Sequence, residues 1–379
     1  MKRIRVLVIE DSLTARRRLV EALEADPALQ VVGEARDGRE GVDLCERLRP
    51  DVVTCDMMMP VMTGVSAVER IMAYWPTPIL VVSASTNRGE LFRTYDALAA
   101  GAIDVLEKPR ADEPHEAWDE RFRAAVKLVS RIKVITHPRA RLAAARGETL
   151  PRAPVPPPTT APPSAHAPGA GAGGERPGEG APDVASGKVV AIGGSTGSPA
   201  AIVEILRRLP RAFPAPVLLV IHIDEPFGAA FAEWLDGMSP LPVRYAQDRE
   251  ALSALRRSAV LMAPPGRHLV LDRDRLRLDD GPERHSCKPS VDVLFESVAR
   301  HAGARAVACL LTGMGRDGAA GLLAIRAAGG VTIAQDEASS VIFGMPREAI
   351  RVGAAMQVLP LQEIAAALVA ATQAAGRLA

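Results

Sequence analysis

The chain has 379 residues, enough for two or three domains, because one domain usually spans about 100–200 residues. Hydrophobic residues make up 48% and charged residues 24%, a composition that excludes disorder along the whole chain. The formal net charge of +1 and the aromatic content of 3% argue against a nucleic-acid-binding surface.

Short runs of β-branched residues alternate with helix-compatible stretches in the first third of the chain. Repeated strand and helix signals of this kind predict a parallel, doubly wound α/β sheet. Such sheets bind their ligands outside the carboxyl ends of the strands, so residues at those ends are the candidates for function. The expected strands are Ile4–Ile9, Val31–Ala35, Val52–Cys55, Ile79–Val82 and Ile103–Leu106.

A segment rich in proline, glycine and alanine follows. Between Pro151 and Gly187 there are ten Pro, seven Gly and eight Ala, with almost no bulky apolar residue to bury. We therefore expect a flexible linker over residues 136–187, which separates a first domain at 1–135 from a second at 188–379.

The second domain repeats the alternation of strands and helices. Between its halves, Pro242–Leu278 is rich in proline and turn residues, which predicts an antiparallel or irregular insertion. The whole is thus expected to be α/β. The expected strands are Val189–Ile192, Val217–Ile221, Val307–Leu311 and Val331–Ala334, and the expected helices include Phe227–Leu235 and Ala319–Ala327.

The location of the protein can be predicted from two features. No apolar run approaches the roughly 20 residues that a membrane span needs. The cysteines show no CxxC motif and no zinc-like pairing, and in so long a chain they cannot form a disulfide framework. We therefore expect a cytoplasmic protein without membrane insertion, with Cys45, Cys55, Cys287 and Cys309 as reduced thiols.

Polar residues gather at the strand ends of the first domain. Three carboxylates at one sheet edge repel one another unless a hard cation such as Mg²⁺ neutralises them, and a lysine and a hydroxyl suit an incoming phosphoryl group. Any one of these residues alone is better explained as a cap or a solvated surface group, whereas together they indicate a site. They are Glu10, Asp11, Asp56, Ser83 and Lys108.

This arrangement resembles the receiver domain of two-component response regulators over roughly residues 1–133. The resemblance implies a flavodoxin-like fold with five parallel strands, Asp56 as the phosphoacceptor and a histidine kinase as the phosphodonor. It also implies that Mg²⁺ is required for phosphorylation. The implied metal contacts are Glu10, Asp11, Asp56 and the backbone carbonyl of Met58, and the implied phosphoryl contacts are Ser83 and Lys108.

A glycine-rich turn opens the second domain. Residues 193–197, Gly-Gly-Ser-Thr-Gly, follow an expected strand and precede a helix, and they fit the G-x-S-x-G pattern that lifts a nucleophilic serine clear of a sheet. Similar turns bind phosphates or dinucleotides, but the spacing fits neither GxGxxG nor GxxxxGK[ST]. The pattern favours Ser195 as a nucleophile.

A serine nucleophile requires a base, and His222 is the best placed histidine. It ends the strand Val217–Ile221, and adjacent parallel strands bring their carboxyl ends together. A core or capping role is the competing interpretation. His268 and His285 are weaker candidates, with substrate-contacting or structural roles. The others, His115, His137, His166 and His301, lie in the first domain's tail, the linker or a surface helix.

The third member of a triad should be a carboxylate on another strand end. Asp317 lies in a glycine-rich loop that directly follows Val307–Leu311, and the backbone N–H of Met314 in that loop could help to bind an oxyanion. A plain helix-capping aspartate explains the position equally well. The order Ser, His, Asp along the chain differs from that of the α/β-hydrolases.

Five segments of the second domain together resemble the catalytic domain of the chemotaxis protein-glutamate methylesterase (CheB) family: IGGSTGS, the strand-terminal His222, GPERHSCKPSVDVLFESVA, LLTGMGRDGAAGL and IAQDEASSVIFGMPREAI. A receiver joined by a linker to this domain is that family's architecture. The resemblance implies Ser195 as nucleophile, His222 as base and Asp317 as its orienting carboxylate. It implies the amides of Thr196 and Met314 as the oxyanion hole.

The sequence departs from both family patterns at a few positions. Glu10 stands where receivers usually carry Asp, and Val105 where a switch aromatic is common. Ile221 stands where many methylesterases carry glutamine, and Ile223-Asp224-Glu225 replaces a commoner Met-Pro type of loop. These departures bear on metal affinity, on switching and on substrate contacts.

The function expected from the sequence is that of a response regulator whose second domain hydrolyses glutamate γ-methyl esters on chemoreceptors in chemotaxis adaptation, and deamidates receptor glutamines. Ester hydrolysis should need no cofactor. Two alternatives stay open. One is a phosphorylation switch that uses the second domain as a non-catalytic docking surface, and the other is a small-molecule esterase under phosphorylation control.

Overall fold

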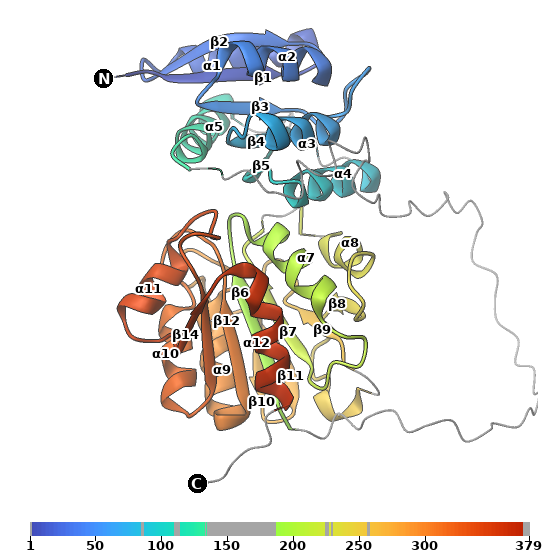
Figure 1. The fold of residues 1–379 in the computed structure, drawn as a ribbon, viewed down its shortest axis with the longest axis vertical. Coiled ribbons are helices and arrows are strands. Elements are labelled where there is room, and N and C mark those ends of the chain that lie inside the picture. Colours follow the sequence, from blue (N-terminus) through green and yellow to red (C-terminus); the bar gives the residue numbers. More distant parts are fainter. Residues whose placement is uncertain are drawn as a thin grey trace, which may run out of the picture.

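The computed structural model describes residues 2–84, 87–109, 114–132, 134, 187–223, 227–228, 230–255 and 258–373. The expected linker at 136–187, including the proline-rich stretch, lies outside the described residues except for Gly187. The described residues form two α/β domains, which follow one another along the long axis of the molecule and are each built on their own parallel sheet (Figure 1).

The N-terminal sheet has five parallel strands in the order β2-β1-β3-β4-β5, which confirms the predicted flavodoxin-like fold. Helices cover both faces, because alternate residues of the central strands are buried in two separate clusters: Leu7 and Ile9 on one face, Val6 and Val8 on the other. The strands are β1 (Ile4–Ile9), β2 (Leu29–Ala35), β3 (Val52–Cys55), β4 (Ile79–Ser83) and β5 (Asp104–Glu107). The helices are α1 (Leu13–Glu24), α2 (Gly38–Leu48), α3 (Gly64–Tyr74), α4 (Arg88–Ala99) and α5 (His115–Val129).

The C-terminal sheet is also parallel and doubly wound, as predicted, with seven strands in the order β14-β13-β12-β6-β7-β9-β8. Its four longest strands coincide with the expected ones to within a residue or two. The strands are β6 (Val189–Gly194), β7 (Val217–Ile221), β8 (Val243–Tyr245), β9 (Val260–Met262), β12 (Ala306–Leu310), β13 (Val331–Gln335) and β14 (Gln357–Leu359). The helices are α7 (Ser198–Arg208), α8 (Phe231–Asp236), α9 (Val291–Ala302), α10 (Ala319–Ala327), α11 (Met345–Arg351) and α12 (Leu361–Gln373), with short 3₁₀ turns at Leu252–Ala254 and Gly303–Arg305.

The segment Pro242–Leu278 is only partly the antiparallel insertion that was expected. Its β10 (His268–Asp272) and β11 (Arg275–Asp279) do form an antiparallel hairpin. However, β8 and β9 join the main sheet as parallel strands, with Val260 paired to Val217. A three-residue strand gives too short an apolar run to reveal its direction from sequence, and its neighbours in the sheet decide it.

Helix α4 of the N-terminal domain packs against α7 and α8 of the C-terminal domain (Figure 1). Tyr95 is fully buried in this contact, where its hydroxyl donates to the carbonyl of Phe227. The indole N–H of Trp234 donates to Asp96 at 2.9 Å. Apolar burial and buried polar pairs therefore both hold the two domains together.

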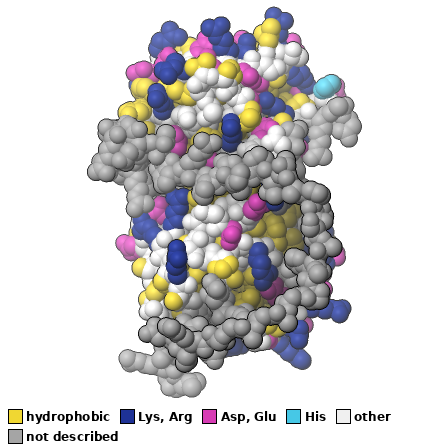
Figure 2. Space-filling view, turned by 90° about the vertical axis from the view of Figure 1, so that its right-hand side faces the viewer, with side chains coloured by type: hydrophobic (Ala, Val, Ile, Leu, Met, Phe, Trp, Pro, Cys, Tyr) yellow, Lys and Arg dark blue, Asp and Glu magenta, His cyan; other side chains and the backbone are white. Residues whose placement is uncertain are grey.

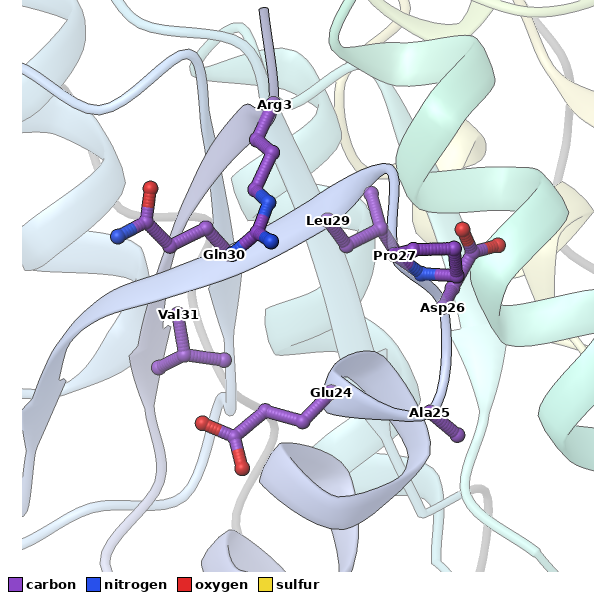
Figure 3. A pocket seen from close by; sticks show the side chains of 8 residues that line it. All are labelled: Arg3, Glu24, Ala25, Asp26, Pro27, Leu29, Gln30 and Val31. Atoms are coloured by element: carbon purple, nitrogen blue, oxygen red, sulfur yellow. The ribbon is translucent and has the colours of Figure 1, made fainter.

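The remaining surface shows no single-sign charge field on the face drawn in Figure 2, where basic and acidic side chains are interspersed. A hollow of about 430 Å³ lies at the amino ends of β1 and β2, lined by Arg3 and Glu24 among others (Figure 3). This is the opposite end of the sheet from the candidate sites. Within the described part of the chain, no helix is both long and apolar enough to cross a membrane.

Candidate functional site

Ser195 lies in a tight turn between β6 and α7, at the carboxyl end of the strand. Gly197 in this turn has a φ of +79°, a backbone conformation that side-chain-bearing residues rarely adopt, and a Cβ there would lie 2.5 Å from Val341. The Ser195 N–H donates to the carbonyl of Thr312 at 3.0 Å, which ties the turn to the loop after β12. The serine is half-buried and sits at the amino end of α7.

His222 follows β7, the strand next to that of the serine. The pairing of Ile221 with Gly194 brings the two strand ends together, and the His222 N–H donates to the Gly194 carbonyl at 3.1 Å. On its other side the ring approaches Asp317, with 2.9 Å between Nε2 and Oδ2. The structure thus gathers the three expected triad residues at one edge of the sheet. The other ring nitrogen, Nδ1, lies 3.6 Å from Cys287 Sγ.

The Asp317 carboxylate is buried and held by the amino end of α9. Burial opposes its charge, but hydrogen bonds from His222, from the backbone N–H of Asp292 and from Ser290 keep the pKa of Asp317 below its usual range. The carboxylate therefore stays ionised and fixed. Its donors besides His222 are Ser290 Oγ at 2.8 Å and the amides of Val291, Asp292 and Gly318 at 2.7, 3.0 and 3.1 Å.

Cys287 is the second neighbour of the His222 ring, with 3.6 Å between Sγ and Nδ1. Burial favours the neutral imidazole, but the hydrogen bond to Asp317 and the contact with Cys287 together raise the pKa of His222 to about 9. The sequence analysis identified neither Ser290 nor Cys287 as a site residue. Both lie in the GPERHSCKPSVDV segment, whose match to the methylesterase pattern was the available signal.

The loop after β12 packs against the turn that holds Ser195. A Cβ on Gly313 would lie 2.8 Å from Ser195 Cβ, so only glycine allows the loop this close. Met314 follows and its side chain is 54% exposed. Among the described residues, no hydrogen bond uses the backbone N–H of Thr196 or Met314, the two groups expected to bind an oxyanion.

The other candidate histidines have structural partners. His268 is buried, accepts from the Ser290 N–H at 3.1 Å and contacts the carbonyl of Pro282 at 3.0 Å. His285 contacts Asp292 at 3.1 Å. Among the histidines set aside, His137 and His166 lie outside the described residues, while His115 begins α5 and His301 is half-buried in α9.

A second cluster lies at the carboxyl edge of the N-terminal sheet. Carboxylate oxygens of Glu10, Asp11 and Asp56 lie within 4.8 Å of one another. Lys108 Nζ lies 2.8 Å from Glu10 and 3.0 Å from Asp56. Burial raises the pKa values of both Glu10 and Asp56, and repulsion between the two charges adds to the rise for Glu10. Three oxygen donors with excess negative charge fit a hard divalent cation such as Mg²⁺.

Ser83 and Met58 are the other two residues expected at this site. The hydroxyl of Ser83 donates to Glu90 at 3.0 Å instead of pointing to the carboxylates. The side chain of Met58 is 42% exposed, and the group expected to bind the metal is its backbone carbonyl. Val105 packs partly buried between the core clusters of the two domains.

The positions that depart from the methylesterase pattern have ordinary surroundings where they are described. Ile221 is buried at 3% exposure at the end of β7. Ile223 packs against the core of the C-terminal domain. Asp224 and Glu225 lie outside the described residues. Both isoleucines therefore belong to the apolar packing of the C-terminal domain.

The chain is similar to known proteins along nearly its whole length. The family profile "CheB methylesterase" matches residues 190–368, and "Response regulator receiver domain" matches residues 6–117. An Anaeromyxobacter dehalogenans relative, named protein-glutamate methylesterase/protein-glutamine glutaminase 2, is 42% identical and covers 96% of this chain and 96% of its own. A Myxococcus xanthus relative with the same name and the number 4 is 42% identical, with 98% of each chain covered.

Solved structures also match the chain, domain by domain. The catalytic domain of Thermotoga maritima CheB methylesterase is 35% identical and has a TM-score of 0.46, with 48% of this chain and 97% of that chain covered. The family itself rests on the relatives that match from the receiver to the last helix. On that ground the chain belongs to the receiver-linked CheB family of protein-glutamate methylesterase/protein-glutamine glutaminases.

Proposed function

We propose that this protein hydrolyses glutamate γ-methyl esters on chemoreceptors and deamidates receptor glutamines, under control of phosphorylation at Asp56. The observation that carries the proposal is the His222–Asp317 pair beside the Ser195 turn, at one sheet edge. The names of the relatives supply the substrate class. The receiver match supports a chemotaxis histidine kinase as phosphodonor.

In this mechanism Ser195 Oγ attacks the side-chain carbonyl carbon while His222 Nδ1 takes the hydroxyl proton. Asp317 accepts from Nε2 and stabilises the imidazolium that forms. The oxygen that becomes negative is stabilised by the backbone N–H groups of Thr196 and Met314.

The imidazolium then returns the proton to the leaving group, so methanol departs from an ester and ammonia from an amide. Water attacks the acyl-serine with His222 as base again, which releases the glutamate carboxylate and restores the serine. Ester and primary amide share every step, and this is why one site serves both substrates.

Phosphorylation would use the cluster at Asp56. Glu10, Asp11, Asp56 and the Met58 carbonyl would hold Mg²⁺, which supplies positive charge against the incoming phosphoryl oxygens. Lys108 already faces Asp56 and would pair with the phosphoryl group. Ser83 would exchange its bond to Glu90 for one to the phosphoryl group.

The receiver would restrict the esterase site through the domain contact. Asp104 lies 3.5 Å from the hydroxyl of Thr196, the residue after the nucleophile. Val341, which packs against Gly197, also contacts the apolar core of the receiver. Phosphorylation changes the receiver surface, and a tenfold activation needs only about 1.4 kcal/mol of weaker docking.

We place the protein in the cytoplasm. All four cysteines are free thiols, as expected in a reducing compartment. A kinase phosphodonor is found there as well. Its proposed partners are the kinase, on the receiver match, and the chemoreceptors, on the names of the relatives.

The decisive experiment incubates the purified full chain with receptor carrying radiolabelled methyl esters and counts released methanol. The matched control is Ser195→Ala. A docking protein without catalytic activity would release no methanol from any ester. A small-molecule esterase would cleave a small ester but leave the receptor methylated. Either result would replace the proposed function.

A further inference from the structure

We propose that Cys287 and His222 form a binding site for a thiophilic divalent cation such as Zn²⁺, and that the cation inhibits the esterase by occupying the nitrogen of the base. The regulatory part of this inference rests on the proposed function. The binding part does not, because it concerns only the side chains that would hold the ion.

The spacing of the two donor atoms suits one shared ion. Cys287 Sγ and His222 Nδ1 lie 3.6 Å apart. Zinc binds sulfur at about 2.3 Å and imidazole nitrogen at about 2.0–2.1 Å, and a tetrahedral angle between them separates the two donors by about 3.5 Å. The donors therefore need little movement to bind an ion between them.

The far side of the histidine is already arranged as in protein zinc sites. Metal-binding histidines usually donate their second ring N–H to a carboxylate, which fixes the ring and increases its basicity. Here Nε2 lies 2.9 Å from Asp317, and Asp317 is itself held by Ser290 and by amides at the start of α9. The orienting partner of a metal-bound histidine is thus in place.

Cys287 differs from the other cysteines in accessibility. Cys45, Cys55 and Cys309 are buried, and burial raises the pKa of each thiol, which keeps them protonated. Cys287 is partly exposed. A cation from solution therefore reaches this thiol first, and water can complete the coordination of a two-ligand site.

Occupation of the site would stop ester hydrolysis. The lone pair of Nδ1 is the one that must accept the serine proton, and a bound cation uses that lone pair. The inhibition should be reversible, because the contacts are coordination bonds that a chelator can compete for.

Binding is tested with Co²⁺ as a spectroscopic substitute for zinc. Titration of the full chain should produce the thiolate-to-cobalt absorption band with one equivalent of ion. The band should persist in Ser195→Ala, which keeps both ligands, and in Asp56→Asn, which disables the acidic cluster of the receiver. It should be lost in Cys287→Ser and Cys287→Ala, and strongly weakened in His222→Gln.

Inhibition is tested by the demethylation rate with and without zinc, each variant compared with its own zinc-free rate. At ten times the dissociation constant the wild-type rate should fall about tenfold and recover with a chelator. Zinc should inhibit the matched control His301→Asn as strongly as the wild type, and it should inhibit Cys287→Ala much less. A cobalt band that survives in Cys287→Ser and Cys287→Ala overturns the site. A wild-type rate that ignores saturating zinc overturns the regulation, whereas an inactive wild type with an intact band points to failure of the proposed function alone.

Discussion

Tyr95 of the receiver lies edge-on against Phe231 of the esterase domain, with ring centroids 5.2 Å apart and an interplanar angle of 85°. The tyrosine is fully buried and belongs to the core cluster of the other domain. Aromatic pairs of this geometry contribute about 0.5–1.5 kcal/mol beyond the area they bury. This contact therefore contributes to the docking of the two domains.

Replacement of Tyr95 should release the esterase from its receiver. In Tyr95→Ala the loss of the ring and of the hydroxyl bond to Phe227 weakens docking, so the unphosphorylated rate should rise by about tenfold or more. The exposed Tyr74→Ala is the matched control and should change nothing. Equal low rates for both variants would mean that the receiver does not restrict the site.

Ser195→Ala should abolish demethylation. Loss of the nucleophile in serine hydrolases costs on the order of 10⁴–10⁶ in turnover. His222→Ala added to it should make the rate scarcely worse, because the two residues act as one unit. Folding by circular dichroism and phosphorylation of Asp56 should stay normal. More than a few per cent residual activity would contradict the assignment.

Ser290 should prove to be a positioning residue for Asp317. Its hydroxyl donates to the carboxylate at 2.8 Å, and hydrogen bonds to charged groups contribute about 1.5–3 kcal/mol. Ser290→Ala should therefore lower kcat about 10–100-fold with little change in KM. Ser290→Thr keeps the hydroxyl and should restore most of kcat. A purely structural role would lower the melting temperature and leave the kcat of the folded protein unchanged.

The esterase should be an alkaline enzyme when metal is removed with a chelator. The pKa of His222 is about 9, so only about 1% of the protein carries the neutral base at pH 7. Because this pKa is raised, the protonated, inactive form of His222 dominates at every pH below about 9. The value of kcat/KM should therefore increase about tenfold per pH unit until the pH approaches 9. Ser195→Ala measures the spontaneous hydrolysis to subtract. A flat profile from pH 6 to 9 would show that the base titrates lower.

Magnesium should stabilise the receiver through its acidic cluster. If Mg²⁺ binds only the folded site, then at 100 times its dissociation constant it should add about 2.7 kcal/mol to the free energy of unfolding. The melting temperature of the receiver should rise with Mg²⁺ in the wild type. In Asp56→Asn the rise should shrink or vanish. An equal rise in both proteins would place the ion elsewhere.

The sequence predicts the parts of the fold that long apolar runs encode. Strands such as β7 and β12 are buried on both faces and read as continuous hydrophobic segments. The strands β8 and β9 are only three residues long, and so short a strand does not reveal its direction in the sequence, so the prediction of an antiparallel insertion was wrong for them. The edge strand β14 is largely exposed and was missed for the same reason.

The candidate site shows a similar division. The positions of Ser195, His222 and Asp317 at or just after the ends of predicted strands were enough to predict that they lie together, because the carboxyl ends of parallel strands lie at one edge of a sheet. The start of α9 that holds Asp317 could not be placed this way, since helix packing depends on tertiary contacts. Cys287 lies 65 residues from His222 along the chain, too far for any spacing rule to link them.

The groups that hold the His222–Asp317 pair all belong to the esterase domain, whereas the receiver reaches the site through Thr196. Release of the receiver would therefore make the site more accessible and leave the arrangement of His222 and Asp317 unchanged. Activation on a bulky receptor helix should appear mainly as easier entry. A small ester that can reach the site while the receiver is docked should be cleaved at nearly the same rate before and after phosphorylation.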